Sequence, residues 1–301
     1  MFLDVNLKKD KDMQDRKHVV CIGAQRTSTT RLHACFHQHP EIFVPEEKEL
    51  HYFNAVLPPY RDDLKVKKPF ITTRLLIKYI LKLTDFYSKS KYGARSMRKL
   101  FLRGRPVPEY YWSHFSDKDL ISCDITPAYS LLSEEGVALI KETAPGSKII
   151  FIVRDPVERM WSELSYHYEK THKGDLSEKS DDLDFIKTKL TRHHLKRGDY
   201  ANTYKIFSKY FSDILILVFE EINQDMNKSM RDICEFIGVD AGDKVLGNMP
   251  LEQKLNASKK ISIPEDIEKI LLDFQAENYS NNITLFGNTV SKWKYYDNFI
   301  E

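Results

Sequence analysis

Two stretches of the chain place polar side chains after a buried strand, in a pattern that suits an anion. The first is "VVCIGAQRTSTTRL", residues 19–32, where an apolar strand runs into the turn Arg26-Thr27-Ser28-Thr29-Thr30. The first N–H groups of a helix lack partners within the helix, and its dipole adds partial positive charge there. A helix that begins at this turn therefore predicts a site for a phosphate or a similar anion.

The turn differs from the loop that binds ATP. That loop needs a second glycine followed by lysine, but Ser28 and Thr29 stand at those two places after Gly23. The cation lies inside the turn, at Arg26, and the shorter loop suits one phosphate with a group attached. Ordinary helix capping by serine and threonine is the alternative explanation for the hydroxyls.

The second stretch is "IIFIVRDPVERMWSELSYHY", residues 149–168. It places Arg154 at the carboxyl end of a strand and Ser162 eight residues later on the next helix. Ligands of α/β proteins bind at the carboxyl ends of parallel strands, and an arginine fork with a hydroxyl suits a phosphate. Alternatively, Arg154 caps a neighbouring helix or pairs with Asp155 or Glu158.

The apolar segments and the helical patterns between them predict how these residues are positioned. Buried strands are expected at 19–23, 121–124, 148–153 and 214–219. Helices are expected from the hydroxyl turn to Pro40, and over 134–144, from 156, after a glycine turn at 196–200 to about 211, and over 226–237 and 264–286. Such strands indicate a parallel sheet covered on both faces. We predict one α/β domain over 18–301, P-loop-like, after a flexible leader at 1–17.

A basic, helical insertion is predicted over 57–113. Between positions 61 and 105 there are 14 Lys and Arg against 3 acidic residues. This imbalance fits a groove for a polyanionic acceptor such as an acidic glycan, an anionic membrane surface, or a solvated helical lid. We expect no nucleic acid partner.

Composition restricts the class of protein. The chain has 301 residues and no run of 18 apolar residues, so no spanning helix is expected. The four cysteines are widely spaced, and Cys21 and Cys123 lie in predicted strands. Reduced thiols in the core of a cytoplasmic protein are therefore favoured over disulfides. No Asp/His cluster has the spacing of a metal site, and no metal is expected.

Together these segments resemble the sulfotransferases that use 3'-phosphoadenosine 5'-phosphosulfate (PAPS), most of all their bacterial and heparan-sulfate-type branch. The segments similar to family motifs are "IGAQRTSTTRL", "KELHYF", "DITPAY", "RDPVERMWS", "RGDYANTYKIFSKYFSDILILVFEEI", "LNASKK" and "FQAENYSNNITLFGNTVSKW". The resemblance implies transfer of a sulfuryl group to a hydroxyl or amine, with 3'-phosphoadenosine 5'-phosphate (PAP) as product. It leaves the acceptor open: a carbohydrate, a lipid, or a small alcohol or amine.

The resemblance also implies roles for individual residues. The nucleotide side would be held by Arg26, Thr27, Ser28, Thr29, Thr30, Arg154, Ser162, Arg197 and Tyr200. On the acceptor side, Glu49 would be the base and His51 a positioning donor, and Asp124 and Tyr129 would also bind the acceptor. Asp124 is a third candidate for the base, with orientation of a neighbouring side chain as the alternative. In an extended segment Glu49 and His51 would share one face. The alternative for Glu49 is a surface carboxylate paired with Lys48.

Three departures from the family pattern matter for activity. Arg26 stands where most relatives carry lysine, so the positive charge is kept while proton donation to the leaving group becomes less plausible. Ser28 replaces glycine and tightens the loop if the turn needs positive φ. Ile125 stands where heparan-type relatives often have lysine, so one acceptor-side cation is missing. A P-loop kinase and an inactive nucleotide-binding relative are the alternative functions.

Overall fold

The structure is a computed structural model that describes residues 16–57, 102, 107–117, 119–172, 186, 189–253 and 262–300. The predicted leader at 1–17 falls outside these ranges except for its last two residues. Arg16 lies over the ring of Trp112, with its guanidinium carbon 5.2 Å from the ring centroid. The predicted basic insertion at 57–113 also lies mostly outside the described residues.

Five parallel strands form one sheet in the order β2-β3-β1-β4-β5. The strands are β1 His18–Gly23, β2 Ile42–Phe43, β3 Ile121–Ile125, β4 Ser147–Val153 and β5 Ile214–Val218. In register, Val20 of β1 lies between Asp124 of β3 and Ile149 of β4. The predicted α/β fold with a central parallel sheet is confirmed.

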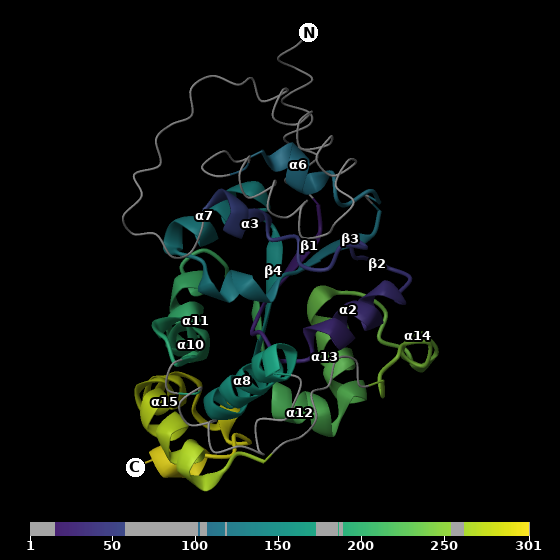
Figure 1. The fold of residues 1–301 in the computed structure, drawn as a ribbon. Coiled ribbons are helices and arrows are strands. Elements are labelled where there is room, and N and C mark those ends of the chain that lie inside the picture. Colours follow the sequence, from purple (N-terminus) through teal and green to yellow (C-terminus); the bar gives the residue numbers. More distant parts are fainter. Residues whose placement is uncertain are drawn as a thin grey trace, which may run out of the picture.

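The central strands are mostly apolar, and their side chains alternate between two buried clusters because each face of the sheet supports its own core. Val20 and Ile22 belong to one buried cluster, whereas Val19 and Cys21 belong to the other. This alternation follows from the pleat, which sends successive side chains to opposite faces. Figure 1 shows the helices on both sides: α2 and α13 flank one face, and α7 and α11 flank the other.

The last of the predicted strands, at 214–219, is less buried than expected. Ile214, Leu215 and Ile216 of β5 are only half-buried, while Leu217 and Val218 are buried. β5 is the last strand in the order and pairs only with β4 within the described sheet. Its edge position therefore leaves part of an apolar strand accessible to solvent.

The predicted helices are present, with small differences at their ends. The α-helices are α2 Thr29–His37, α3 Tyr52–Val56, α6 Pro108–Trp112, α7 Glu134–Thr143, α8 Pro156–His172, α10 Arg192–Gly198, α11 Tyr200–Ser208, α12 Phe219–Gln224, α13 Met226–Ile237, α14 Asp243–Leu246 and α15 Glu265–Phe286. The 3₁₀ turns are η1 Pro127–Leu131, η2 Gly287–Val290 and η3 Tyr296–Phe299. The short helices α12 and α14 were not predicted, and α11 ends at Ser208 instead of near position 211.

The long helix α15 fixes the turn between α10 and α11. A Cβ atom at Gly198 would lie 2.6 Å from Gln275 Oε1, so only glycine permits this approach of the two helices. Asn282 donates to the carbonyl of Gly198 and accepts from the N–H of Ala201, both at 2.8 Å. This contact buries Tyr200, the first residue of α11, almost completely.

All four cysteines are free and buried, as predicted. Burial raises the pKa of Cys21 to about 12 and that of Cys35 to about 11, so both thiols stay protonated at neutral pH. Within the described ranges no helix is both long and apolar enough to cross a bilayer.

Candidate active site

The turn between β1 and α2 is held in an unusual backbone conformation. Arg26 has φ 67° and Ser28 has φ 60°, both in the left-handed region. This region costs an L-residue roughly 1–2 kcal/mol, so serine strains the turn at a position where most relatives carry glycine. Two hydrogen bonds hold the turn: the N–H of Ala24 donates to Ile152 O, and Thr27 Oγ1 donates to Ala24 O, both at 2.6 Å.

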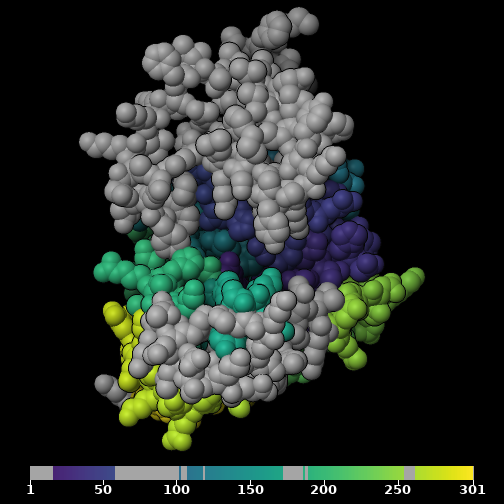
Figure 2. Space-filling view, viewed as in Figure 1, coloured from purple at the N-terminus to yellow at the C-terminus, as the bar shows by residue number. Residues whose placement is uncertain are grey.

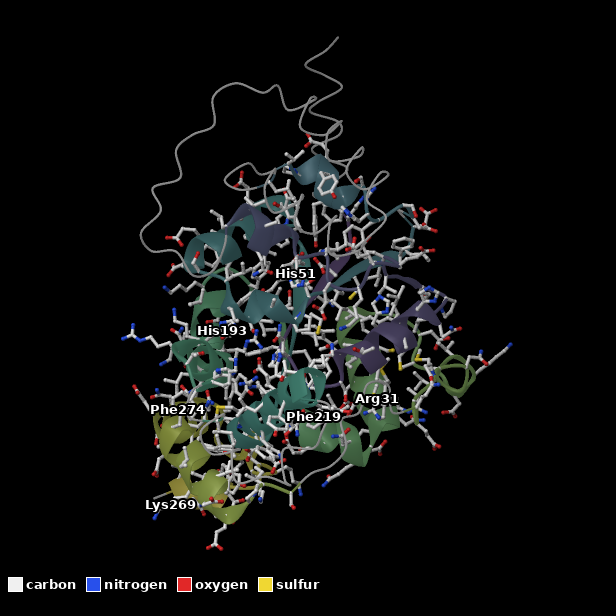
Figure 3. All side chains as sticks on the ribbon, viewed as in Figure 1. Arg31, His51, His193, Phe219, Lys269 and Phe274 are labelled. Carbon is white, nitrogen blue, oxygen red and sulfur yellow. The ribbon has the colours of Figure 1, made fainter. Side chains whose placement is uncertain are left out.

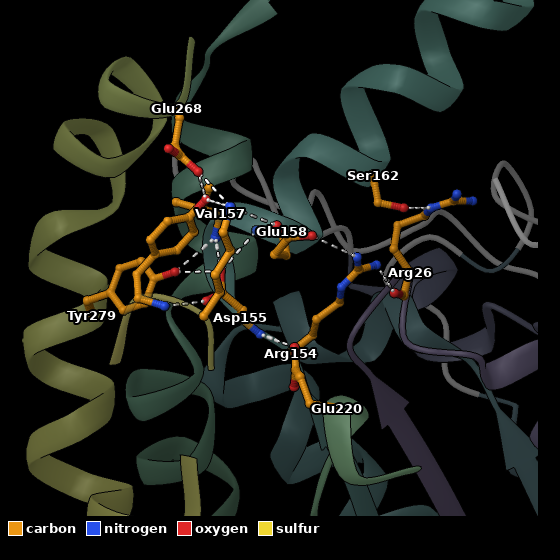
Figure 4. A network of polar contacts seen from close by, with 11 residues as sticks. Arg26, Arg154, Asp155, Val157, Glu158, Ser162, Glu220, Glu268 and Tyr279 are labelled. Carbon is orange, nitrogen blue, oxygen red and sulfur yellow. Dashed lines mark hydrogen bonds and ion pairs between the residues drawn. The ribbon is translucent and has the colours of Figure 1, made fainter. Parts of the chain in front are cut away.

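The two motifs predicted to hold phosphates meet in the structure. Arg26 Nε donates to Ser162 Oγ at 3.1 Å, and Arg154 Nη1 donates to the carbonyl oxygen of Arg26 at 3.0 Å (Figure 4). The guanidinium of Arg26 also lies 4.7 Å from the ring centroid of Tyr166. The carboxyl ends of β1 and β4 are adjacent, which brings together residues more than 120 positions apart.

Arg154 is fixed by groups from two elements. Its guanidinium stacks on Phe219, 4.5 Å from the ring centroid, and Nη2 lies 3.7 Å from Glu158 Oε2. The alternative pairing with Glu158 therefore exists, whereas Asp155 instead caps α8 by accepting from the N–H of Val157 at 3.0 Å. Burial lowers the pKa of Arg154 despite the nearby glutamates. Its Nε is buried and has no hydrogen-bond partner among the described residues.

Glu220 lies beside this arginine at the carboxyl end of β5. One oxygen, Oε1, accepts from the N–H of Asp155 at 3.1 Å, and the other is buried without a partner among the described residues. Burial raises the pKa of Glu220 to about 7. The carboxyl group is therefore partly protonated near neutral pH.

Arg197 and Tyr200 reach the same region from α10 and α11. Arg197 forms an ion pair with Glu163 on α8, and Arg159 Nη1 binds the other oxygen of Glu163 at 2.8 Å. Burial alone would raise the pKa of Glu163, but the charges of both arginines lower it to about 2. The hydroxyl of Tyr200 is buried and has no hydrogen-bond partner among the described residues.

A turn before α3 brings Glu49 and His51 into contact. Glu49 Oε2 lies 3.2 Å from His51 Nε2, and Oε1 lies 2.9 Å from Lys48 Nζ. The expectation of an extended segment is wrong: Glu49 has φ 66° and His51 has φ 54°, and the two side chains meet because the chain turns. Burial favours a raised pKa for Glu49, but the hydrogen bond from His51 and the charge of Lys48 outweigh it and lower the pKa to about 2.

Asp124 and Tyr129 lie beneath this turn and are 1% and 0% exposed. The carboxylate of Asp124 accepts from the hydroxyls of Thr126 at 2.6 Å, Tyr129 at 3.0 Å and Tyr111 at 3.2 Å. Burial raises the pKa of Asp124 to about 6, although these hydrogen bonds oppose the rise. The two residues contact each other, and their direct contact with an acceptor stays a prediction.

Several polar or aromatic residues at the site were not anticipated from the sequence. Each contacts a predicted site residue or the start of α2: they are Arg31, Asn54, Glu163, Tyr166, Phe219 and Glu220. Arg31 is buried in the first turn of α2, where the helix dipole disfavours a cation, and its Nη2 lies 3.4 Å from Asn223 Oδ1. Figure 3 labels it near Phe219, with His51 at some distance from both. Glu220 could have been found from the sequence, because a charged residue directly after an apolar strand is a candidate site residue.

Comparison with known proteins identifies the family. A family model described as the sulfotransferase family matches residues 18–243, and the chain belongs to this family. A sulfotransferase from Alicyclobacillus acidocaldarius is similar in structure, with TM-score 0.57, 17% identity, and coverage of 90% of this chain and 95% of that one. A Mycobacterium avium sulfotransferase has TM-score 0.50 and 14% identity, covering 94% and 80%. No curated protein matches the chain significantly.

These findings make the protein a sulfotransferase by family, and at such identities the structural matches support the fold alone. The two motifs that meet at Arg26 and Arg154 both lie inside the matched segment. Among the described residues, no group of three or more His, Cys, Asp or Glu is arranged to hold a metal ion.

The buried Glu163 makes a prediction about stability. Glu163→Gln is expected to destabilise the protein by about 3 kcal/mol, because Arg159 and Arg197 lose their carboxylate. The pKa of Glu163 is depressed, so its stabilising contribution is complete above pH 4.5 and is lost as the pH falls toward 2. Urea denaturation at pH 7 and pH 3 measures both effects.

The exposed pair of Glu134 and Lys209, 2.7 Å apart, provides the control. Glu134→Gln is expected to leave the free energy of unfolding nearly unchanged, because both side chains are roughly half exposed and solvent screens their attraction. Equal losses in the two variants at pH 7 would show that Glu163 has no special role in packing α8 against α10.

Proposed function

We propose that the protein transfers a sulfuryl group from PAPS to a hydroxyl or amine. One observation carries the proposal: Arg26 and Arg154, from two strand ends, converge with Ser162 beside the start of a helix. Arginine side chains, a hydroxyl and the first N–H groups of a helix are donors that suit an anion such as a phosphate. The family and the order of the motifs favour PAPS as that anion.

The residues present fit a nucleotide with a phosphate at each end of its ribose. The 5'-phosphosulfate would lie at the turn Arg26–Thr30 and the first N–H groups of α2. The 3'-phosphate would be held by Arg154 and Ser162, with Tyr200 within the same cluster. The support is that Arg154 Nε and the Tyr200 hydroxyl are buried with no partner among the described residues. Buried polar groups of this kind are costly unless something binds them.

Arg26 would provide the electrostatic part of the catalysis. Bound PAPS supplies an activated sulfuryl group, and its phosphate gains negative charge as that group leaves. The guanidinium of Arg26 stays protonated and opposes this charge where it develops, a large contribution in transfer reactions. Ser162 and the ring of Tyr166 hold the guanidinium in place. Arg197 would act less directly, since Glu163 already neutralises it.

Glu49 is the proposed base on the acceptor side. Its low pKa keeps it ionised at neutral pH, and the contacts with Lys48 and His51 are what lower that pKa. An acceptor hydroxyl that replaced either contact would raise the pKa of Glu49 and make it a stronger base. His51 is proposed as the donor that orients the acceptor, and Asn54 Oδ1, 3.4 Å from His51 Nδ1, orients its ring.

The acceptor class, branch and compartment are finer proposals. We place the chain in the bacterial and heparan-sulfate-type branch on its motifs, and a glycan is the favoured acceptor. Residues 61–105, whose basic side chains would contact an acidic glycan or a membrane surface, lie outside the described residues except for Leu102. A reducing compartment such as the cytoplasm is supported by four free, buried cysteines.

The donor is tested by thermal shift with PAP and with ATP plus Mg²⁺. PAP at a hundredfold excess over its Kd is expected to add about 2.7 kcal/mol of stability and to raise Tm by several degrees. Stabilisation by ATP and Mg²⁺ alone would indicate a P-loop kinase and overturn the proposal. A radiolabelled PAPS transfer screen over glycans, lipids and small alcohols then identifies the acceptor, and PAP binding without any transfer would indicate an inactive relative.

Replacing Arg154 is expected to weaken nucleotide binding. Arg154→Ala removes a charged donor to the 3'-phosphate, so the Kd for PAP should rise about 10- to 100-fold. Calorimetry measures the Kd. Arg231→Ala, on the exposed side of α13, is the matched control and should bind PAP like the parent. An unchanged Kd in Arg154→Ala would refute the assignment of Arg154 to the nucleotide.

Replacing Glu49 is expected to lower turnover without weakening the binding of PAP. Glu49→Gln keeps the size of the side chain but removes the base, so turnover should fall by roughly 10²–10⁴-fold. The Kd for PAP should stay within about twofold of the parent value, because Glu49 is on the acceptor side. Transfer from radiolabelled PAPS to the best acceptor of the screen measures the rate. Full turnover in this variant would exclude Glu49 as the base.

A further inference from the structure

The turn that carries Glu49 and His51 is anchored from below by η1. The N–H of Tyr52 donates to the hydroxyl of Tyr129 at 3.1 Å, and Asn54 Nδ2 donates to the carbonyl of Ala128 at 3.3 Å. Both acceptors belong to η1, which directly follows β3. Tyr52 and Asn54, the first and third residues after His51, therefore connect this turn to η1 at the end of β3.

The hydroxyl of Tyr129 takes the place of a missing helix cap. Tyr52 is the first residue of α3, and its N–H is one of the donors that a helix cannot satisfy internally. His51 occupies the capping position, but its side chain accepts no hydrogen bond from a backbone N–H of the helix. Since Tyr52 is 2% exposed, water does not readily serve its N–H. Tyr129 therefore satisfies a buried donor that would otherwise be orphaned.

Asp124 sets the direction of this hydroxyl. A tyrosine has one proton to donate, and the Tyr129 hydroxyl lies 3.0 Å from Asp124 Oδ2. Burial and the charge of Asp124 hold the pKa of Tyr129 well above its usual value, so the proton stays on the tyrosine. With its proton directed to Asp124, the oxygen of Tyr129 is left as an acceptor for the N–H of Tyr52.

Tyr111 is a second tyrosine whose hydroxyl contacts Asp124, but its other hydrogen-bond partner is different. Tyr111 donates to Asp124 Oδ2 at 3.2 Å and lies 2.8 Å from His18 Nε2 on β1. Like Tyr129 it is completely buried. No described contact joins the Tyr111 hydroxyl to the turn. The two hydroxyls thus differ in their second partner, which is the N–H of Tyr52 for Tyr129 and the ring of His18 for Tyr111.

We propose that Tyr129, oriented by Asp124, is a positioning residue that fixes the Glu49–His51 turn for catalysis and does not itself contact the acceptor. Both turn residues have left-handed backbone, a conformation that costs roughly 1–3 kcal/mol each and persists only where its surroundings enforce it. The anchor at Tyr129 provides that enforcement. The inference rests on the proposed role of Glu49 as the base.

The test compares Tyr129→Phe with Tyr111→Phe. Each variant removes one buried hydroxyl from Asp124 and keeps the ring, so their losses of packing are matched. Release of radiolabelled sulfate from PAPS, with water as acceptor, gives a turnover rate that requires no knowledge of the natural acceptor. Tyr129→Phe is expected to lower this kcat about 10- to 100-fold, because small misplacements of catalytic groups cost this much. Tyr111→Phe should stay within about threefold of the parent.

Two further measurements separate positioning from general damage. The Kd for PAP should be unchanged in both variants, because the nucleotide side does not include either tyrosine. The NMR chemical shifts of the His51 ring should change in Tyr129→Phe and match the parent in Tyr111→Phe, since only the first variant frees the turn. This readout does not depend on turnover.

Two results would overturn the inference: equal effects of the two variants on kcat and on the His51 chemical shifts, or unaltered His51 chemical shifts in Tyr129→Phe. If the parent protein neither binds PAP nor turns over PAPS, the proposed sulfotransferase function fails, while the His51 chemical shifts still report whether Tyr129 holds the turn.

Discussion

The structure depends on holding positive charge together at the carboxyl ends of β1 and β4. Arg154 reaches across to the carbonyl of Arg26, and each guanidinium lies on an aromatic ring, Phe219 for one and Tyr166 for the other. Aromatic faces and a carbonyl dipole stabilise these cations in part, and the carboxylates of Glu158 and Glu220 add to this at Arg154. A phosphorylated donor, as proposed above, would complete the neutralisation of both guanidiniums.

The parallel sheet with helices on both faces could be predicted from the sequence because the hydrophobic patterns of strands and helices are local. Uninterrupted apolar strands such as residues 148–153 require cover on both faces, and this alone implies a parallel sheet with helices on either side. The partial exposure of β5 could not be predicted from the sequence. The order of the strands decides which strand lies at the edge of the sheet, and the apolar residues of a strand do not reveal that order. The short α12 and α14 escaped prediction for a similar reason, as helices this short owe their stability to tertiary packing.

The site was predictable where a motif sits at a strand end and unpredictable where it depends on contacts distant in sequence. Arg26, Arg154 and Ser162 were placed together by topology alone, and the structure brings them within hydrogen-bond distance. Glu49 and His51 were expected to share one face of an extended segment. They meet instead because both have left-handed backbone, which the sequence does not reveal at these non-glycine residues. Partners such as Glu163 and Phe219 come from other elements, and a single sequence gives no indication of such pairings.

The central position of β1 places the two proposed half-sites on either side of one strand. The residues proposed to hold the donor come from the turn after β1, the start of α2, the end of β4 and the helices after β4, whereas those proposed for the acceptor come from the segment after β2, from β3 and from η1. The central α8, part of which reaches the surface in Figure 2, carries Ser162 of the proposed donor side. The two sides are also joined directly, because Thr203 Oγ1 on α11 donates to the carbonyl of Ser130 in η1 at 3.0 Å. Transfer between two substrates would therefore take place over the carboxyl end of β1, the strand that borders both sides.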